Sequence, residues 1–370
     1  MLFQFLFVHL YAENKFKHGE ASYQLRIQRK GEQPMRTERY IDMKSPLTGG
    51  RVKLVEDVEE QEFRKEKFLV HVRYCICEDT GEQFTIEGQD DFVLNQIYSQ
   101  YRLNHGIPFT DEIIALRELY GLNYTQMSKI LGFGANQWKQ YEQGVVPSES
   151  NGKIIITIRS KACMLALLEA SRGEFQEAEF AKVHASIQNA PEIAEKTIDQ
   201  QLFYGKTLRG AYNGFSPMDT MKLQAMVCYL VAAEGGSVCP TKLNKEMFYA
   251  DFLHFRRHSR SISGLQYRAI QYGPVPEHFD TIYDNVLGIN KESVITFDSE
   301  SIRLHLTAES DTSSLTEEEI ATLADVSRLL HPMKTSEAVE LSHAEPAWQH
   351  YEQQHAFIPY SEAYNLKAMF

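Results

Sequence analysis

The chain has 370 residues, of which 43 % are hydrophobic and 24 % charged, a composition that excludes wholesale disorder and allows two or three globular domains. No apolar run approaches the roughly 18 residues that span a bilayer, and the apolar opening Met1–Tyr11 lacks the positive flank and cleavage site of a signal peptide. Five scattered cysteines do not form a secreted disulfide framework and favour a cytoplasmic location.

The net charge of −12 is unevenly distributed. The acidic excess lies mainly in the C-terminal half, where Glu317–Glu319 form one cluster, whereas residues 109–175 are near balance. Neutralising phosphates supplies most of the affinity of a nucleic-acid binder, so an acidic chain is a poor binder as a whole. The asymmetry predicts one module that can approach DNA and another that faces a different partner, such as a basic protein.

The N-terminal part of the chain changes pattern at residue 43. Residues 1–42 show no clear element and are interpreted as a leader or extension, with an ordinary strand and helix as the alternative. Residues 43–102 predict a small antiparallel β unit, because Arg51–Val58 and Phe68–Cys77 alternate as strands do and glycine-rich turns flank them. This unit is expected to end in a helix over Asp90–Tyr101.

The rest of the chain predicts a mainly helical arrangement, so the expected fold class is α+β, mainly α. Residues 103–175 predict a five-helix domain, although the β-branched start of its last part, Ile154–Ile158, also fits a strand. Residues 176–215 are polar, with breaks at Pro191 and Gly205, and are interpreted as a connector. Residues 216–370 predict a mostly helical domain with one β-hairpin.

Two turns of the β unit share a spacing of candidate ligands. SPLTGG at residues 45–50 and CEDTGE at 77–82 resemble the two knuckles of a zinc ribbon, CPxCGG and CxxCGE. Each knuckle grips Zn²⁺ with two thiolates, but Ser45, Thr48 and Thr80 replace three of the four cysteines and only Cys77 remains. Two ordinary β-turns are the alternative. We interpret the unit as a degenerate zinc ribbon and expect no metal or other cofactor.

Residues 110–144 predict a helix-turn-helix. Thr110 is expected to cap the first helix, Thr125 the second, and Ala135–Gln143 to form the third. The string LNYTQMSKILGFGANQWKQYEQG at 122–144 resembles the helix-turn-helix of Xre-type and MqsA-type proteins. The layout of a ribbon followed by this motif is that of MqsA-type antitoxins.

Six polar side chains of this motif are the predicted DNA contacts. The third helix would lie in the major groove, where amides suit adenine and a lysine reaches guanine or phosphate. The start of the second helix would hold the DNA backbone. The predicted residues are Thr125, Gln126, Asn136, Gln137, Lys139 and Gln140.

The resemblance also sets expectations for specificity and assembly. Asn136 matches a base-reading asparagine of the MqsA family, whereas Gln140 stands where that family has an arginine, so the operator should differ. Trp138 is expected to anchor the third helix to the first. Proteins of this kind bind palindromes as homodimers, and Ile154–Leu168 is the candidate dimerisation surface. A helical hairpin that merely packs is the alternative.

The C-terminal domain contains four further strings. LNKEMFYADF at 243–252 predicts an amphipathic helix, YGPVP at 272–276 predicts a turn at Gly273-Pro274, and SISGLQY and SHAEPAW stand at 261–267 and 342–348. A hairpin is expected over Val294–Phe297 and Ile302–Leu306, and a capped helix from Leu315. In this order the strings resemble the Panacea (SocA-like) domain over about 150 residues.

This second resemblance implies an antitoxin module that neutralises unrelated toxins by direct binding and, in one branch, a link to protease delivery. Arginines can pair with a toxin's carboxylates. The candidate toxin-binding residues are Lys245, Tyr249, Arg256, Arg257, Arg260, Tyr267 and Tyr272.

No catalytic residue is expected in this domain. His254 and His258 have the i, i+4 spacing of metal ligands, but no acidic or cysteine partner accompanies them and neighbouring arginines would repel a cation. Asp251, Tyr272, His343 and Glu345 come with no nucleophile, phosphate loop or cofactor fingerprint.

The combined expectation is an antitoxin of a type II toxin–antitoxin system. It would bind its cognate toxin through 216–370 and repress its own operon as a homodimer at operator DNA, without contact with a membrane. The alternatives are a stand-alone transcriptional regulator, a protease-adaptor-like protein and an enzyme of unknown type.

Overall fold

The computed structural model describes residues 36–191, 209–296, 299–307 and 311–368. These residues form an α+β fold with more helix than strand. The chain divides into two compact units. The first contains the residues up to Val58, Val72–Asn95 and Phe203–Phe370, and the second contains Glu59–His71 and Gln96–Leu202. Most of the expected leader, residues 1–35, lies outside the described residues.

A four-stranded sheet has the order β1-β2-β3-β4 and its apolar side chains alternate along the strands. Val52, Leu54 and Cys75 are buried together, and Ile41 and Met43 pack against them. The strands are β1 (Thr37–Lys44), β2 (Arg51–Phe63), β3 (Glu66–Cys77) and β4 (Gln83–Phe84). Strands β2 and β3 therefore confirm the two predicted strands.

The interpretation of residues 37–42 as a leader is wrong. Strand β1 pairs antiparallel with β2 from Thr37↔Glu56 to Lys44↔Arg51. Its sequence TERYIDMK places Ile41 and Met43 on the face that covers the small core of the sheet. The alternation of apolar and polar residues in β1 is weak in the sequence, because only Ile41 and Met43 among its side chains cover the core of the sheet.

Seven helices and one 3-10 turn follow within the described part of 89–190. The predicted helix after the sheet is confirmed as α2, and five helices lie within 103–175. They are α2 (Gln89–Asn104), α3 (Thr110–Leu119), α4 (Tyr124–Ile130), α5 (Gln137–Glu142), α6 (Glu149–Thr157), α7 (Lys161–Ala170), η1 (Arg172–Glu174) and α8 (Glu177–Asn189).

The core of the second unit differs from expectation in two ways. Residues 154–157 belong to helix α6, and Ile155, Ile158, Met164 and Leu168 are fully buried in the unit's own core. The proposed dimerisation surface is therefore internal at these four side chains, whereas Ile156 is 37 % exposed. Helix α8, expected within the connector, packs its apolar residues into the same core, so residues 177–189 belong to this unit.

The described part of 209–368 is mostly helical, as expected. Its first elements are α10 (Thr220–Ala233), β5 (Ser237–Val238), α11 (Pro240–His258), β6 (Tyr267–Ile270), β7 (Gly273–Pro276) and α12 (Phe279–Asn285). The later elements are β8 (Ile289–Thr296), β9 (Ser299–Leu306), α13 (Glu317–Leu330), α14 (Thr335–His343), α15 (Pro346–Gln349), η2 (Glu352–Gln354), β10 (Phe357–Ile358) and η3 (Tyr360–Asn365).

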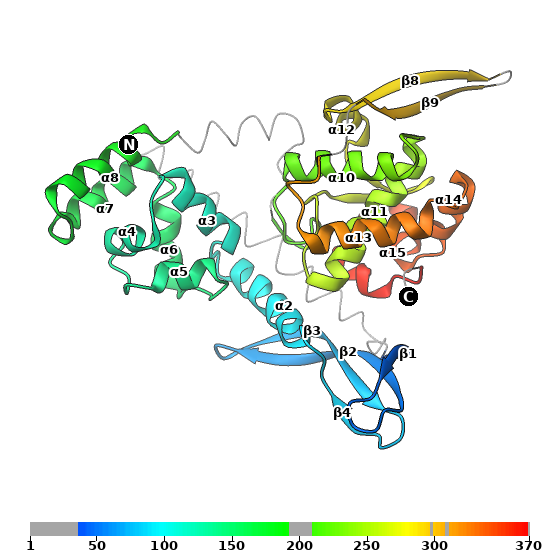
Figure 1. Cartoon of the computed structure of the whole chain (residues 1–370), viewed down its shortest axis with the longest axis horizontal. Coiled ribbons are helices and arrows are strands. Elements are labelled where there is room, and N and C mark those ends of the chain that lie inside the picture. The colour runs from blue at the N-terminus through cyan, green and yellow to red at the C-terminus, as the bar shows by residue number, and fades with distance from the viewer. Residues whose placement is uncertain (1–35, 192–208, 297–298, 308–310, 369–370) are drawn as a thin grey trace. The chain divides into compact units, whose positions relative to one another are not determined.

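Helix α11 lies at the centre of this domain and contacts α10, α13 and α14 (Figure 1). The prediction of an amphipathic helix is wrong, because every residue from Lys242 to Arg256 is buried. A helix buried on all sides is normally apolar all round. Here the polar residues of α11 face the interior, where other segments of the domain supply hydrogen-bonding partners.

Two small sheets flank the helices. One has the order β10-β6-β7 and the other β5-β9-β8. The expected turn at Gly273-Pro274 lies two residues earlier, because Ile270 pairs with Gly273 across a two-residue loop. The predicted hairpin is confirmed as β8 and β9, each longer than expected. None of the described helices combines the length and apolar character that crossing a membrane requires.

Candidate functional site

Two turns of the four-stranded sheet have the same backbone hydrogen bonds. The N–H of Ser45 donates to the carbonyl of Gly50 at 2.9 Å, and the N–H of Gly49 donates to the carbonyl of Ser45 at 2.8 Å. The turn at Cys77 repeats both bonds at 2.9 and 2.8 Å. Gly49 and Gly81 have φ of 77° and 72°, a region that glycine enters without steric cost. The two turns are structurally equivalent.

One thiol and three hydroxyls meet between these turns. Thr48 Oγ1 lies 3.3 Å from Cys77 Sγ. Hydrogen bonds from Ser45, Thr48 and Thr80 lower the pKa of the Cys77 thiol to about 6. Hydroxyls are not the soft thiolate ligands that structural zinc requires, so this set does not fit the metal. Within the described residues, no group of three or more His, Cys, Asp or Glu side chains is placed to hold a metal ion.

Helices α3, α4 and α5 pack around Trp138, which is fully buried. Its indole N–H donates to Glu142 Oε1 at 2.6 Å, and Arg117 Nε donates to the same oxygen at 2.7 Å. Arg117 belongs to α3, so the carboxylate of Glu142 joins α5 to α3. The expected role of Trp138 as an anchor is confirmed.

The helix caps differ from the prediction. Asn123 caps α4, since its side chain accepts the N–H of Gln126 at 2.9 Å, and Gln126 Oε1 accepts the N–H of Asn123 at 3.1 Å. This reciprocal pair is a capping box. Thr125 therefore lies inside the first turn of α4 and does not cap it. In α3 the cap position belongs to Phe109, and Thr110 is the first helical residue.

The structure separates the predicted DNA contacts into two groups. Gln126 takes part in the capping box and its Nε2 lies 3.4 Å from Glu179 of α8, so its amide already has partners. Gln137 is half-buried at the start of α5. Asn136 occupies the N-cap of α5 but makes no capping hydrogen bond with its side chain. The exposed members are Thr125, Asn136, Lys139 and Gln140.

A buried carboxylate organises the centre of the C-terminal domain. Asp251 Oδ1 accepts the N–H groups of Ile262 and Ser263 at 2.8 and 2.9 Å, and Oδ2 accepts the hydroxyls of Tyr267, at 2.7 Å, and Ser263. Burial raises the pKa of Asp251, and these four hydrogen bonds oppose that effect. The FYADF and SISGLQY strings are thus joined through one side chain.

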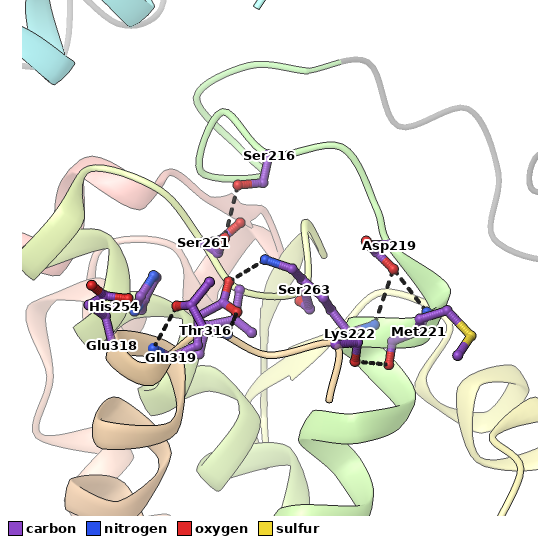
Figure 2. Close-up of polar contacts among 12 residues, drawn as sticks. Ser216, Asp219, Met221, Lys222, His254, Ser261, Ser263, Thr316, Glu318 and Glu319 are labelled. Atoms are coloured by element: carbon purple, nitrogen blue, oxygen red, sulfur yellow. Dashed lines mark hydrogen bonds and ion pairs between the residues drawn. The ribbon is translucent and has the colours of Figure 1, made fainter. Parts of the chain in front are cut away.

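The N-terminal ends of α10 and α13 meet beside this network (Figure 2). Asp219 caps α10 and accepts the N–H groups of Met221 and Lys222 at 2.9 and 3.1 Å. Thr316 caps α13 and accepts the N–H of Glu319 at 3.3 Å. Lys222 Nζ donates to Glu319 Oε1 at 2.5 Å and links the two helices. The acidic start of α13 is therefore partly used in holding the domain together.

His254 is a buried, neutral histidine. The hydroxyl of Thr322 donates to the carbonyl of Glu318 at 2.9 Å, so His254 Nδ1 must carry a proton and donate to Thr322 Oγ1 at 3.1 Å. Burial, with the nearby His258, lowers the pKa of His254 to about 3. The two imidazole rings lie 4.5 Å apart, and the described residues place no third metal ligand beside them.

Four of the seven candidate toxin-binding residues are buried, which corrects their assignment as direct contacts. Lys245 Nζ donates to the carbonyl of Pro274 at 2.9 Å, and burial lowers the pKa of Lys245 to about 7. The hydroxyl of Tyr249 lies 3.2 Å from Glu345 Oε1. Their polar groups already bind the domain itself. The buried members are Lys245, Tyr249, Arg256 and Tyr267.

The other three candidates reach the surface to different degrees. Tyr272, in the loop between β6 and β7, is 61 % exposed. Arg257 is half-buried and forms an ion pair with Asp325 of α13 at 2.8 Å. Arg260 is half-buried just after α11. The structure does not gather these residues with the buried four into one exposed surface.

The residues that suggested acid–base chemistry have separate packing roles. The His343 ring stacks on Trp348 at 4.0 Å, and Glu345 accepts the N–H groups of Lys367 and Ala368 at 2.8 and 3.0 Å. Asp251 belongs to the central network described above. They therefore do not form a nucleophile–base arrangement.

Sequence reasoning missed a buried cluster of charged residues. Lys242 Nζ lies 2.7 Å from Glu234, and Glu246 is buried one turn farther along α11. Burial and the neighbouring Glu234 raise the pKa of Glu246 well above its ordinary value. The i, i+4 spacing of Lys242 and Glu246 was visible in the sequence. The approach of Glu234 from the end of α10 was not.

Comparison with known proteins identifies one segment. Residues 243–349 match the family model described as "Antitoxin SocA-like, Panacea domain". The matched segment runs from the first turn of α11 to the end of α15 and includes Asp251, Tyr267 and the β8–β9 hairpin. No curated protein and no solved structure matches the chain. The match supports the resemblance of the C-terminal domain and does not extend to the rest of the chain.

Proposed function

We propose that this protein is an antitoxin that binds and neutralises a protein toxin through its C-terminal domain and represses its own operon through α4 and α5. The match of residues 243–349 to a SocA-like antitoxin domain carries the first part. The charge of that domain fits a basic protein partner, since residues 216–370 contain 21 acidic and 12 basic residues.

The arrangement of α5 supports DNA binding. Asn136, Lys139 and Gln140 are exposed, while Trp138 and Tyr141 are buried against the rest of the unit. A short helix that is held by its apolar face and presents amides and a lysine can enter the major groove. The protein would bind a palindromic operator as a homodimer.

The antitoxin function is tested with the product of the adjacent reading frame. Expression of that product alone is expected to stop growth, and co-expression of this protein is expected to restore growth. Direct association of the two purified proteins should accompany the rescue. Growth arrest that this protein does not relieve would contradict the antitoxin function.

DNA binding is tested with Asn136→Ala combined with Gln140→Ala. Each lost amide–adenine contact should cost about 1–3 kcal/mol, so specific operator binding should fall at least about thirtyfold. Toxin neutralisation should be unchanged, since the variant residues lie outside the C-terminal domain. Gln143→Ala removes an exposed amide from the end of α5 and serves as the control. Loss of both activities in the double variant would contradict the modular arrangement.

A further inference from the structure

The β8–β9 hairpin extends from the C-terminal domain as an arm beside α10 and α12 (Figure 1). Its register runs from Ile289↔Leu306 to Thr296↔Ser299. The third strand of the sheet, β5, pairs with β9 only at Ser237↔His305 and Val238↔Leu304. Beyond that point the arm is a two-stranded ribbon.

Strand β8 forms one edge of this sheet over its whole length. The sheet order is β5-β9-β8, and among the described residues no further strand pairs with β8. Isolated two-stranded ribbons are marginally stable in water, and an open edge is a template for another strand. An added strand would stabilise the arm, and the open edge of β8 can pair with it.

The hydrogen bonds at the base of the arm show which backbone groups face the open edge. The N–H of Thr307 donates to the carbonyl of Gly288 at 2.8 Å, so these two residues form a hydrogen-bonded pair. Such pairs alternate along an antiparallel ladder. Asn290 and Val294 therefore direct their N–H and C=O groups toward β9, while Ile289 and Ser293 direct theirs outward.

We propose that the outer edge of β8 binds an extended strand of the partner toxin, which adds to the sheet in the order β5-β9-β8-partner. This inference rests on the proposed antitoxin function and names the surface that performs it. Outward backbone donors and acceptors are complemented by the main chain of another strand.

Charge determines the class of partner. The domain carries nine more acidic than basic residues. On and beside β8, the side chains of Glu292 and Asp284 stay 65 % and 61 % exposed although they pair with His305 and Lys291. Nucleic-acid phosphates would be repelled there, whereas a basic protein strand would be attracted. The apolar side chain of Leu287, which is 72 % exposed just before β8, can add a side-chain contact to main-chain pairing.

Proline substitution tests the edge without breaking the arm. Ser293→Pro removes an outward N–H and places the ring in the path of an added strand, but leaves the β8–β9 ladder intact. Ser293→Ala keeps the N–H and is the matched control. Ile302 lies opposite Ser293, and Ile302→Pro tests the outer edge of β9 in the same way.

Binding is measured with full-length chains and the purified product of the adjacent reading frame. Ser293→Pro should weaken binding at least about tenfold, whereas Ser293→Ala and Ile302→Pro should bind within about twofold of wild type. Equal binding by Ser293→Pro and wild type, or a loss in Ile302→Pro alone, would overturn the proposal. No binding by wild type would instead contradict the antitoxin function itself.

Hydrogen exchange on the wild-type complex gives a second readout that needs no variant. The amides of Ile289 and Ser293 should become protected when the partner binds, whereas those of Asn290 and Val294 are protected in the free protein by the β8–β9 ladder. Protection that appears only outside the arm would overturn the edge as the binding surface. In free Ser293→Pro, retained protection at Asn290 and Val294 shows that the arm is still folded.

Discussion

The hydroxyl oxygen of Thr48 lies 3.3 Å from the sulfur of Cys77, across 29 residues of sequence. Both belong to turns that share a hydrogen-bonding pattern, and Ser45 and Thr80 complete the set of side chains at the Cys77 thiol. In the zinc ribbon that the two turns resemble, these four positions hold the metal ligands, and hydroxyls stand in three of them here.

Restoring the three thiols should restore zinc binding. Ser45→Cys combined with Thr48→Cys and Thr80→Cys would supply four thiolates from two equivalent turns, which suits tetrahedral Zn²⁺. We expect about one zinc per chain in the purified triple variant, and well under one in wild type, by elemental analysis. Thr48→Cys alone provides only a pair of thiols and is the control. A triple variant that folds but retains no zinc would contradict the proposed descent from a zinc ribbon.

Removal of Asp251 should destabilise the C-terminal domain severely. Asp251→Ala leaves the N–H groups of Ile262 and Ser263 and the hydroxyl of Tyr267 buried without their acceptor. Each such group costs about 1–3 kcal/mol, so a total loss of more than about 3 kcal/mol is expected in denaturant-induced unfolding. Tyr267→Phe removes one bond and should cost about 1 kcal/mol. Asp284→Ala changes an exposed carboxylate and should cost little.

Lys245 should make the free energy of unfolding depend on pH in the alkaline range. Burial lowers its pKa to about 7 in the folded protein, against about 10.4 when unfolded, so the unfolded state binds more protons between these values. The free energy of unfolding should therefore increase as pH rises from about 7 to about 10. Lys245→Met should remove this slope, whereas Lys153→Met, at an exposed position, should keep it. An unchanged slope in Lys245→Met would assign it to another group.

Glu179 should weaken DNA binding by the proposed helix-turn-helix. Its carboxylate lies 3.4 Å from Gln126 Nε2 and 3.8 Å from Lys129 Nζ, beside the start of α4 where the DNA backbone is expected. Glu179→Gln removes a negative charge that repels phosphate and should tighten operator binding several-fold at low salt. Glu169→Gln makes the same charge change on α7 and should have a smaller effect. Weaker operator binding by Glu179→Gln would contradict this placement of the DNA.

Local sequence patterns predicted the elements whose signals lie close together in the chain. Alternating residues in β2 and β3 and the Thr316 start of α13 depend on neighbours only a few residues away. The match at residues 243–349 likewise follows from short strings in a fixed order. Two of the expected caps were wrong. Asn123 takes the N-cap of α4, and in α3 the N–H of Phe109 bonds to the Glu112 carboxylate, so Thr110 is the first helical residue.

Tertiary structure decided which polar residues are available to a partner. In the sequence, the lysine and tyrosine of LNKEMFYADF fit the polar side of an amphipathic helix. In the fold, α10, α13 and α14 surround α11, so Lys245 and Tyr249 bond to Pro274 and Glu345 instead. Packing around a helix depends on segments up to about a hundred residues away in the chain. The hydrophobic periodicity of the helix itself therefore cannot predict it.

The sequence by itself determined the helical C-terminal domain and predicted a helix-turn-helix and a degenerate zinc ribbon, because each depends on residue type and short spacing. Only the tertiary structure placed Ser45, Thr48 and Thr80 around Cys77, buried four of the candidate toxin contacts and left β8 at the edge of its sheet. These three results depend on which helices and strands pack against each segment in the folded protein. Burial and edge exposure are properties of the assembled fold, not of any one segment.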